Sequence, residues 1–254
     1  MTGFIHSFGS EWLKKKRTAA SLLTVIGSIL IPVIIIIARI DDPSALAVAN
    51  GQPRIWESLY NRNWQLMGTL FLPMGVVLAT SLITQLEFRN NTWKQLCTTP
   101  QSLTTIFLAK LAVIGVMLLE FFLLFTVGIW LTGAVPGLFF RNVAYPAEAF
   151  PWKAVLDGSA RFFLDILPVV ALQYLLGLRF KNFLIPLGVG LGLYVASMIA
   201  VHWRYGYWIP YTYSAYNFVG RAAEKFHTHY WAAGYALLFT GLAYILYITR
   251  KEKG

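Results

Sequence analysis

Residues 19–38 read AASLLTVIGSILIPVIIIIA, twenty consecutive positions without a charged side chain. The hydrocarbon core of a bilayer is roughly 30 Å thick, and a helix needs about 20 apolar residues to cross it. The stretch therefore predicts a membrane-spanning helix.

The residues on either side of this stretch resemble the flanks of a secretory signal peptide. Four basic residues precede it, and Ala45-Leu46-Ala47 follows it as a potential cleavage sequence. However, the apolar run is longer than the roughly 7–15 residues of a signal peptide, and Arg39, Asp41 and Asp42 separate it from the alanines. We therefore predict a span that is retained.

Five further stretches have a similar length and composition: residues 66–86, 107–131, 160–178, 184–202 and 230–248. Hydrophobic residues make up 57% of the chain and charged residues 13%, with a mean hydropathy of +0.59. A soluble domain carries roughly 25% charged residues because it has a surface to hydrate. The composition predicts an all-α integral membrane protein, with six transmembrane helices in a single domain over residues 1–254.

The net charge of +10 is consistent with this topology. Six spans place both termini on one side, which we take as cytoplasmic. The inner segments then hold twelve Lys and Arg against three acids, and the outer segments hold nine against seven. An excess of Lys and Arg in cytoplasmic loops is the usual orientation signal. We therefore expect a multi-pass protein of a bacterial inner or plasma membrane, surrounded by lipid, with no nucleic-acid partner.

Tryptophan, cysteine and histidine add weaker information. All nine tryptophans fall in connections or near predicted span ends, where amphipathic rings favour the headgroup level. Cys97 is the single cysteine, so neither an intrachain disulfide nor a cysteine-based metal site can form. His227 and His229 form an HxH pair without a third ligand nearby, which favours a solvated loop. We predict no metal site.

Residues 1–18 precede the first span and contain apolar residues at roughly helical spacing: Phe4, Ile5, Phe8, Trp12 and Leu13. This pattern is typical of a short helix lying in the cytoplasmic interface. The alternative is a basic flank that only orients the first span, and the residues do not decide between the two.

The connection between the second and third spans is polar and long: residues 85–110 read QLEFRNNTWKQLCTTPQSLTTIFLAK. A helix starting near Glu87 would stop at Pro100, and Ser102 is a good N-cap for the next helix. A short helix on the cytoplasmic face could dock a soluble partner or could be a plain connector. Both remain open from the residues alone.

This connection resembles that of ABC-2 type exporter permeases, which carry an acid, a Thr and a Lys, a helix ending at Pro, and a Lys opening the third span. The corresponding residues here are Glu87, Thr92, Lys94, Pro100 and Lys110. One departure is Asn91, where the family usually has a small residue. The six-span layout and the N-terminal interfacial helix also match.

The resemblance implies a coupling helix that receives nucleotide-driven motion from a separate ABC ATP-binding subunit, through Glu87, Arg89, Thr92, Lys94 and Pro100. It also implies a second permease copy or a paralogue. The chain has no G-x-x-x-x-G-K-[ST] phosphate loop. Gly188, Gly190 and Gly192 lie inside a span, where glycines favour close helix packing. We therefore expect no catalytic residues and no cofactor here, with ATP and Mg²⁺ on the partner.

Residues 203–229 (WRYGYWIPYTYSAYNFVGRAAEKFHTH) form an aromatic-rich external segment between the fifth and sixth spans. The resemblance implies short re-entrant helices that cap the transport path. An aromatic loop at the interface is the alternative. Irregular backbone is tolerated at membrane depth only where protein or water covers it.

Two acids lie within predicted spans. Glu120 is near the middle of the third span, where a charge costs a few kcal/mol or more. It is a candidate for the substrate path, or a neutral acid bonded to a neighbouring helix, for example near Gln173 or Tyr174. Asp165 follows Arg161 by four residues, which a helix-surface ion pair explains.

The resemblance implies a permease subunit of an ATP-driven exporter that works by alternating access, and this is the function that we expect. Its aromatic, charge-poor interior suits an amphipathic or hydrophobic cargo, and the family resemblance extends this to drugs, antimicrobial peptides and lipid-linked glycans. The alternatives are a non-transporting assembly or sensor subunit and, with less support, an intramembrane enzyme, which would need clustered catalytic groups.

Overall fold

The computed structural model describes residues 2–16, 18–89, 102–140, 143–218 and 228–249, and these residues contain helices and no strand. The elements, in chain order, are α1 (Thr2–Lys15), α2 (Ala19–Ile40), α3 (Pro43–Asn50), α4 (Ile55–Leu66), the π-helix η1 (Met67–Phe71), α5 (Leu72–Arg89), α7 (Leu103–Ala134), α8 (Pro136–Phe139), α9 (Trp152–Arg179), α10 (Leu184–Ala200), the 3-10 helices η2 (Gly206–Trp208) and η3 (Pro210–Thr212), α11 (Tyr213–Tyr216) and α12 (Thr228–Ile248).

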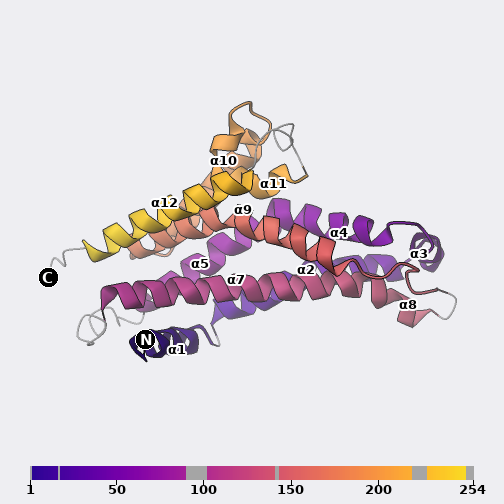
Figure 1. Ribbon diagram of the computed structural model, residues 1–254, viewed down its shortest axis with the longest axis horizontal. Coiled ribbons are helices and arrows are strands. Elements are labelled where there is room, and N and C mark those ends of the chain that lie inside the picture. Colours follow the sequence, from indigo (N-terminus) through magenta and orange to yellow (C-terminus); the bar gives the residue numbers. More distant parts are fainter. Residues whose placement is uncertain (1, 17, 90–101, 141–142, 219–227, 250–254) are drawn as a thin grey trace.

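The long helices run side by side along the long axis of the molecule (Figure 1). In the described part of the chain, five are long and apolar enough to cross a membrane: Ala19–Ile40, Ile55–Leu86, Leu103–Phe139, Trp152–Arg179 and Thr228–Ile248. They contain the first, second, third and fourth predicted spans and the sixth. The all-helical membrane fold predicted from the sequence is therefore confirmed.

The fifth predicted span, residues 184–202, is an apolar helix of 17 residues, α10. At 1.5 Å per residue it is about 25 Å long, shorter than the roughly 30 Å of a bilayer core. Six full-length spans are thus not established. The chain nevertheless returns along the bundle between α9 and α12, because these two helices run in the same direction.

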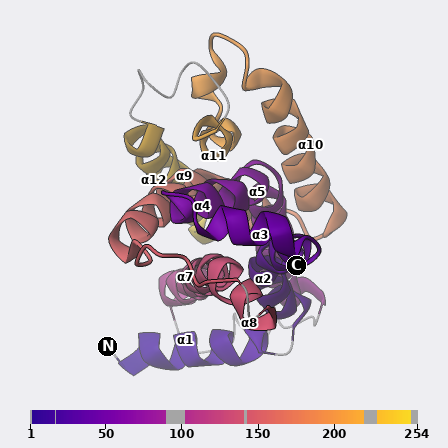
Figure 2. The same cartoon turned by 90° about the vertical axis from the view of Figure 1, so that its right-hand side faces the viewer.

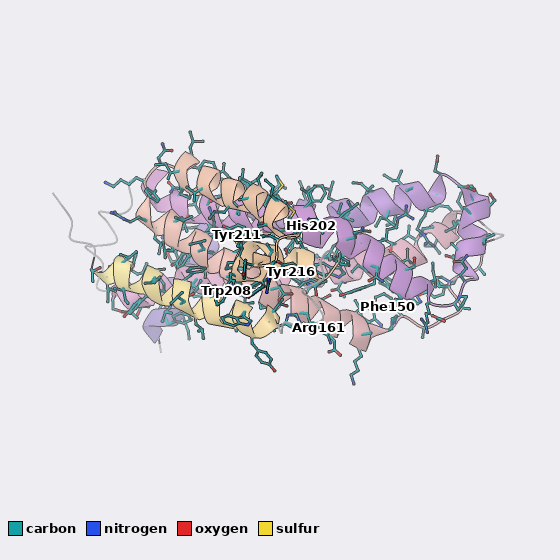
Figure 3. All side chains as sticks on the ribbon, turned by 90° about the horizontal axis from the view of Figure 1, so that it is seen from above. Phe150, Arg161, His202, Trp208, Tyr211 and Tyr216 are labelled. Atoms are coloured by element: carbon teal, nitrogen blue, oxygen red, sulfur yellow. The ribbon has the colours of Figure 1, made fainter. Side chains whose placement is uncertain are left out.

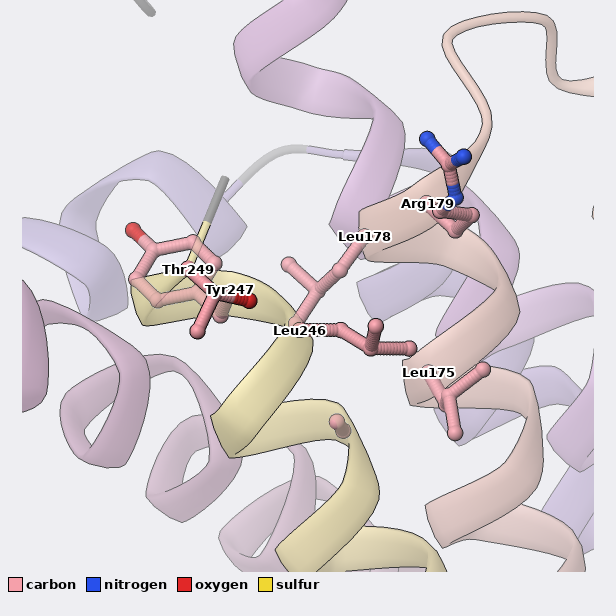
Figure 4. Close-up of a pocket in the computed structure, with 7 residues that line it drawn as sticks. Leu175, Leu178, Arg179, Leu246, Tyr247 and Thr249 are labelled. Carbon is pink, nitrogen blue, oxygen red and sulfur yellow. The ribbon is translucent and has the colours of Figure 1, made fainter. Parts of the chain in front are cut away.

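Figure 4 shows this parallel arrangement at one end of the bundle, where α9 and α12 both finish. A pocket of about 250 Å³ is lined there by Leu178 and Arg179 of α9 and by Leu246 and Tyr247 of α12. The ends of α9 and α12 and the helix α1 lie toward this end of the molecule, whereas α3 and α8 lie toward the other (Figure 1).

The second span begins eleven residues earlier than predicted, because α4, η1 and α5 form one continuous helix from Ile55. Its first part is amphipathic: Glu57 and Arg62 are exposed, while Trp56 and Trp64 are completely buried. The ring of Trp64 stacks on Phe162 with 4.0 Å between the centroids. These two tryptophans therefore pack against neighbouring helices, and the prediction that tryptophans lie at headgroup level stays a prediction.

Helices α2 and α7 pack closely because a glycine admits a proline ring. A side chain on Gly128 would place its Cβ 2.6 Å from Cγ of Pro32. Farther along α7, a Cβ on Gly133 would meet the Trp56 ring at 2.3 Å. Small residues that let helices approach are the usual basis of packing in membranes, where lipid competes equally for apolar surface.

Candidate transport site

The predicted coupling helix can be placed only at its edges. Glu87 and Arg89 belong to the last turn of α5, while Thr92, Lys94 and Pro100 lie outside the described residues. On the other side, Ser102 is the N-cap of α7 as predicted, and its Oγ accepts a hydrogen bond from the amide of Thr105 at 3.2 Å. Residues 90–101 therefore lie between α5 and α7 in the chain.

Both of these helices form walls of a cavity of about 620 Å³ that opens on the surface of the bundle, since Ile26, Leu70 and Met74 in its lining are exposed. The cavity is also lined by α2, η1, one residue of α9 and two of α10. Its lining residues are almost all apolar, with Thr24 and Thr80 bearing the hydroxyl groups. Thr24 donates its hydroxyl hydrogen back to the carbonyl of Ala20 at 3.0 Å. A cavity of this volume and lining suits a hydrophobic molecule or a hydrocarbon chain.

Two of the residues that line this cavity are glycines, and the space beside each of them belongs to the cavity. No atom lies within 4 Å of the position that a Cβ on Gly75 would take, and Gly27 has only Phe121 nearby, at 3.8 Å. Both residues line the cavity. The space beside them is therefore not needed for packing between helices.

The π-helix η1 lies at one wall of the same cavity and contributes Met67, Leu70 and Phe71. A π-helix leaves backbone groups without their usual helical partners, and such turns are frequent at functional sites. Here the carbonyl of Thr69 accepts a hydrogen bond from the hydroxyl of Tyr194 on α10, at 2.8 Å. Tyr194 therefore ties the short helix α10 to the irregular turn.

Glu120 lies on α7 next to the cavity-lining Phe121, but its carboxylate contacts α1. Oε2 of Glu120 is 2.6 Å from Nζ of Lys15. The side chain of Lys15 is buried and that of Glu120 is 35% exposed. The suggested neighbours make other bonds: Gln173 donates to Ser81 and to the carbonyl of Pro186.

Helix α1 lies across the bundle axis, as Figure 2 shows in the view along the bundle. Its buried stripe is polar and consists of Ser7, Glu11 and Lys15, spaced four residues apart. Ile5 and Leu13 point away from the protein, with 66% and 68% of their surface exposed. The apolar residues predicted to share one face are therefore divided, and the polar face packs against the protein.

These features can be compared with known protein families. Residues 8–197 match the family model described as ABC-2 family transporter protein. The chain belongs to the ABC-2 family. The match includes every residue that lines the apolar cavity, both ends of the segment between α5 and α7, and Glu120. No curated protein and no solved structure matches the chain.

Membership establishes a multi-pass membrane transport subunit and implies association with an ABC ATP-binding subunit. Members are not themselves catalytic. Among the residues that the structure describes, no three His, Cys, Asp or Glu side chains lie close enough together to hold a metal ion.

The part of this ABC-2 chain that follows α10, which was predicted to be external, folds back onto the bundle as η2, η3 and α11. Figure 3 labels three of its aromatic residues, Trp208, Tyr211 and Tyr216, between α10 and α12. Tyr211 and Tyr216 are both buried. The segment contacts α9, α10 and η1, so it reaches the helices that surround the cavity.

Asp165 of α9 is buried beneath this segment with no exposed surface. Oδ2 accepts a hydrogen bond from Nδ2 of Asn217 at 3.0 Å, and Oδ1 lies 2.7 Å from Nδ1 of His229. The predicted surface pair with Arg161 is therefore wrong, because Asp165 points inward. His229 is also not in a solvated loop, since it lies in the first turn of α12.

Sequence patterns could not identify the cavity or the Asp165 cluster. The cavity residues come from six elements whose proximity is a property of the tertiary structure. Asp165, Asn217 and His229 are up to 64 positions apart in the chain. The only available signal was an ionisable residue inside a predicted span, which by itself indicates a partner without naming it.

Proposed function

We propose that this chain is the permease subunit of an ATP-driven exporter, and that it accepts a hydrophobic or amphipathic cargo from the membrane through the apolar cavity. The cavity of about 620 Å³ carries this proposal. Its lining offers almost no polar group to a hydrated solute. Lipid and this lining are equally apolar, so a hydrocarbon chain or a hydrophobic drug would pass from the bilayer into the cavity at little cost, whereas a hydrated solute would have to give up its water.

The position of the coupling segment supports an ATP-driven mechanism. Residues 90–101 connect α5 to α7, and these two helices provide twelve of the residues that line the cavity. A force applied by a partner subunit at Glu87, Arg89, Thr92, Lys94 and Pro100 would therefore reach two walls at once. We propose that nucleotide-driven motion there opens and closes the cavity by alternating access.

The active assembly in this proposal contains two ABC ATP-binding subunits, which bind ATP and Mg²⁺, and a second permease copy or a paralogue. The chain has several exposed apolar helix faces that lipid or a second copy could cover. Both termini are placed in the cytoplasm, because the inner connections then carry the basic excess. Glu120 is retained as a candidate contact for a cationic part of the cargo.

Co-purification tests the central claim. The chain should be co-expressed with a candidate ABC ATP-binding subunit from the same organism, and the complex reconstituted in lipid nanodiscs. We expect ATP hydrolysis by the partner to rise severalfold with the permease present, and to fall to the partner's own rate when Lys94 and Glu87 are both replaced by Ala. A Lys16→Ala variant, altered outside the coupling segment, should hydrolyse ATP normally.

Absence of any stable complex, or ATP hydrolysis unaffected by the permease, would contradict the exporter assignment. It would favour the alternative of a membrane assembly or sensor subunit. An intramembrane enzyme remains the weaker alternative, because the cavity is lined by no ionisable residue.

A further inference from the structure

The carboxylate of Asp165 bonds one residue at the end of α11 and one at the start of α12. Asn217 follows α11 directly, and His229 lies in the first turn of α12. Residues 219–227, between them, lie outside the described part of the chain. The two side chains bond different oxygens of the same carboxylate, at 3.0 Å and 2.7 Å. One buried group thus joins the residue after α11 to the first turn of α12.

The hydrogen bond between His229 and Asp165 depends on the protonation of the imidazole, whereas the bond from the Asn217 amide has no such dependence. A neutral imidazole with a hydrogen on Nδ1 can donate to Asp165, and an imidazolium donates the same bond with a full positive charge. Hydrogen bonds between charged partners are roughly twice as strong as neutral ones. Histidine is the side chain that ordinarily gains or loses a proton between pH 5 and 8.

His229 can exchange that proton with the outside. Its side chain is 31% exposed, whereas Asp165 is fully buried behind it. Around the pair, the structure places Arg161 on α9, which attracts the carboxylate electrostatically, and Tyr213 on α11. Tyrosine is uncharged in this pH range and arginine is always charged, whereas histidine is the residue type whose charge ordinarily changes there.

We propose that Asp165, Asn217 and His229 form a clamp in which Asp165 is the positioning residue for α11 and for the start of α12. We further propose that His229 makes this clamp sensitive to the pH outside the membrane. Protonation of His229 stabilises the closed arrangement, in which the imidazolium faces the carboxylate. Closing of the clamp therefore takes up protons, and the population of the closed state rises as the external pH falls from 8 toward 6. The consequence for transport rests on the proposed function, whereas the clamp itself does not.

A buried reporter can measure opening of the clamp without ATP or a partner. Ala215 of α11 is small and only 2% exposed. In a Cys97→Ser background, Ala215→Cys reacts with a water-soluble maleimide only when the segment opens. The protein is held in nanodiscs, and the labelling rate is measured at pH 6, 7 and 8. Dividing each rate by that of the same protein carrying His229→Gln removes the pH dependence of the thiol chemistry.

We expect this ratio to fall about fivefold between pH 8 and pH 6, from the difference between a neutral and a charged hydrogen bond. Asn217→Ala should raise labelling at every pH and keep the pH dependence. Asp165→Asn should abolish it. His202→Gln is the matched control, since His202 is an exposed histidine near the same segment (Figure 3), and it should leave the profile unchanged.

A ratio that is the same at pH 6 and pH 8 would overturn the proposal, as would a normal profile in Asp165→Asn or a lost profile in His202→Gln. If Asp165→Asn does not fold, the comparison between the parent and His229→Gln decides alone, because the side chain of His229 is partly exposed. Failure to stimulate an ATPase would reject the proposed function and leave this result unaffected.

Discussion

Nζ of Lys15 lies 2.6 Å from Oε2 of Glu120, and this contact joins two residues 105 positions apart. It fastens the crosswise helix α1 to the middle of α7, the helix that follows the proposed coupling segment. The ammonium group also lies 4.1 Å from the ring centroid of Trp12, a favourable cation–π distance. Helix α1 is therefore expected to move together with α7.

We predict that Lys15→Ala and Glu120→Gln each detach α1 partly from the bundle. Each variant leaves one charge of the pair without its partner, at a cost of about 1–3 kcal/mol, because Glu120 is partly exposed and the pair is not fully desolvated. Hydrogen–deuterium exchange over residues 2–15 should increase in both. Lys16→Ala should exchange like the parent, since Lys16 is exposed at the end of α1.

The exchanged pair, Lys15→Glu with Glu120→Lys, separates the two roles of Glu120. If Glu120 serves to hold α1, the exchanged protein should recover both the protection of α1 and ATP-dependent transport. If its carboxylate contacts a cationic cargo, protection should recover while transport does not. Loss of protection in the exchanged protein would show that the 2.6 Å contact does not hold the helix.

A second prediction concerns the contact between α2 and α7. Gly128→Leu should lower the free energy of unfolding by about 1–3 kcal/mol, because the new side chain must displace the ring of Pro32, 2.6 Å from its Cβ. Thermal unfolding of the purified protein measures the change. Gly115→Leu, on the same helix but with no atom within 4 Å, should leave the midpoint nearly unchanged.

A third prediction tests access to the apolar cavity. Gly75→Trp should fill the cavity without a clash, because nothing lies within 4 Å of its Cβ position. Phosphatidylglycerol with a photoreactive acyl chain should label residues that line the cavity in the parent protein and label them several times less in the variant. Gly241→Trp on α12 also enters open space, but outside the cavity, and should be labelled like the parent. Absence of label on the cavity-lining residues of the parent would mean that hydrocarbon does not enter here, and equal labelling of all three proteins would mean that the space beside Gly75 is not on its path.

A fourth prediction concerns the π-helix. Tyr194→Phe removes the hydroxyl that bonds the carbonyl of Thr69 at 2.8 Å, which should cost about 1 kcal/mol. We expect faster hydrogen–deuterium exchange in residues 67–72, with the rest of α4 and α5 unaffected. Tyr230→Phe, at an exposed tyrosine of α12, is the control. Unchanged exchange in Tyr194→Phe would mean that the turn keeps its π geometry without α10.

The sequence predicted those elements whose signal is local. Uninterrupted apolar runs located the five membrane-crossing helices, although the second and the fourth begin earlier than predicted, at Ile55 and Trp152, and the third extends further, to Phe139. The hydroxyl of Ser102 marked the start of α7. The extension of the second span to Ile55 was missed because it carries Glu57 and Arg62 on its exposed face, which lowers the mean hydropathy of any window. Its buried face is visible only as a helical stripe that includes Trp56 and Trp64.

The site depended on contacts that no local pattern encodes. A glutamate within a span predicts that a partner exists, but Lys15 and the Gln173 region were equally available to Glu120 before the helices were placed. The same holds for Asp165, whose spacing from Arg161 suggested a surface pair. Asp165 lies on the buried face of α9, and this decided its partners. That face is the one that packs against α11 and α12.

The length of α10 has a consequence for the lipid around it. A helix of about 25 Å leaves roughly 5 Å of hydrophobic thickness unmatched, so neighbouring acyl chains must compress or tilt there. Such hydrophobic mismatch costs fractions of a kcal/mol per Å. The deformation is confined to one flank of the protein. Thin bilayers would relieve it, which makes acyl-chain length an adjustable variable in any reconstitution.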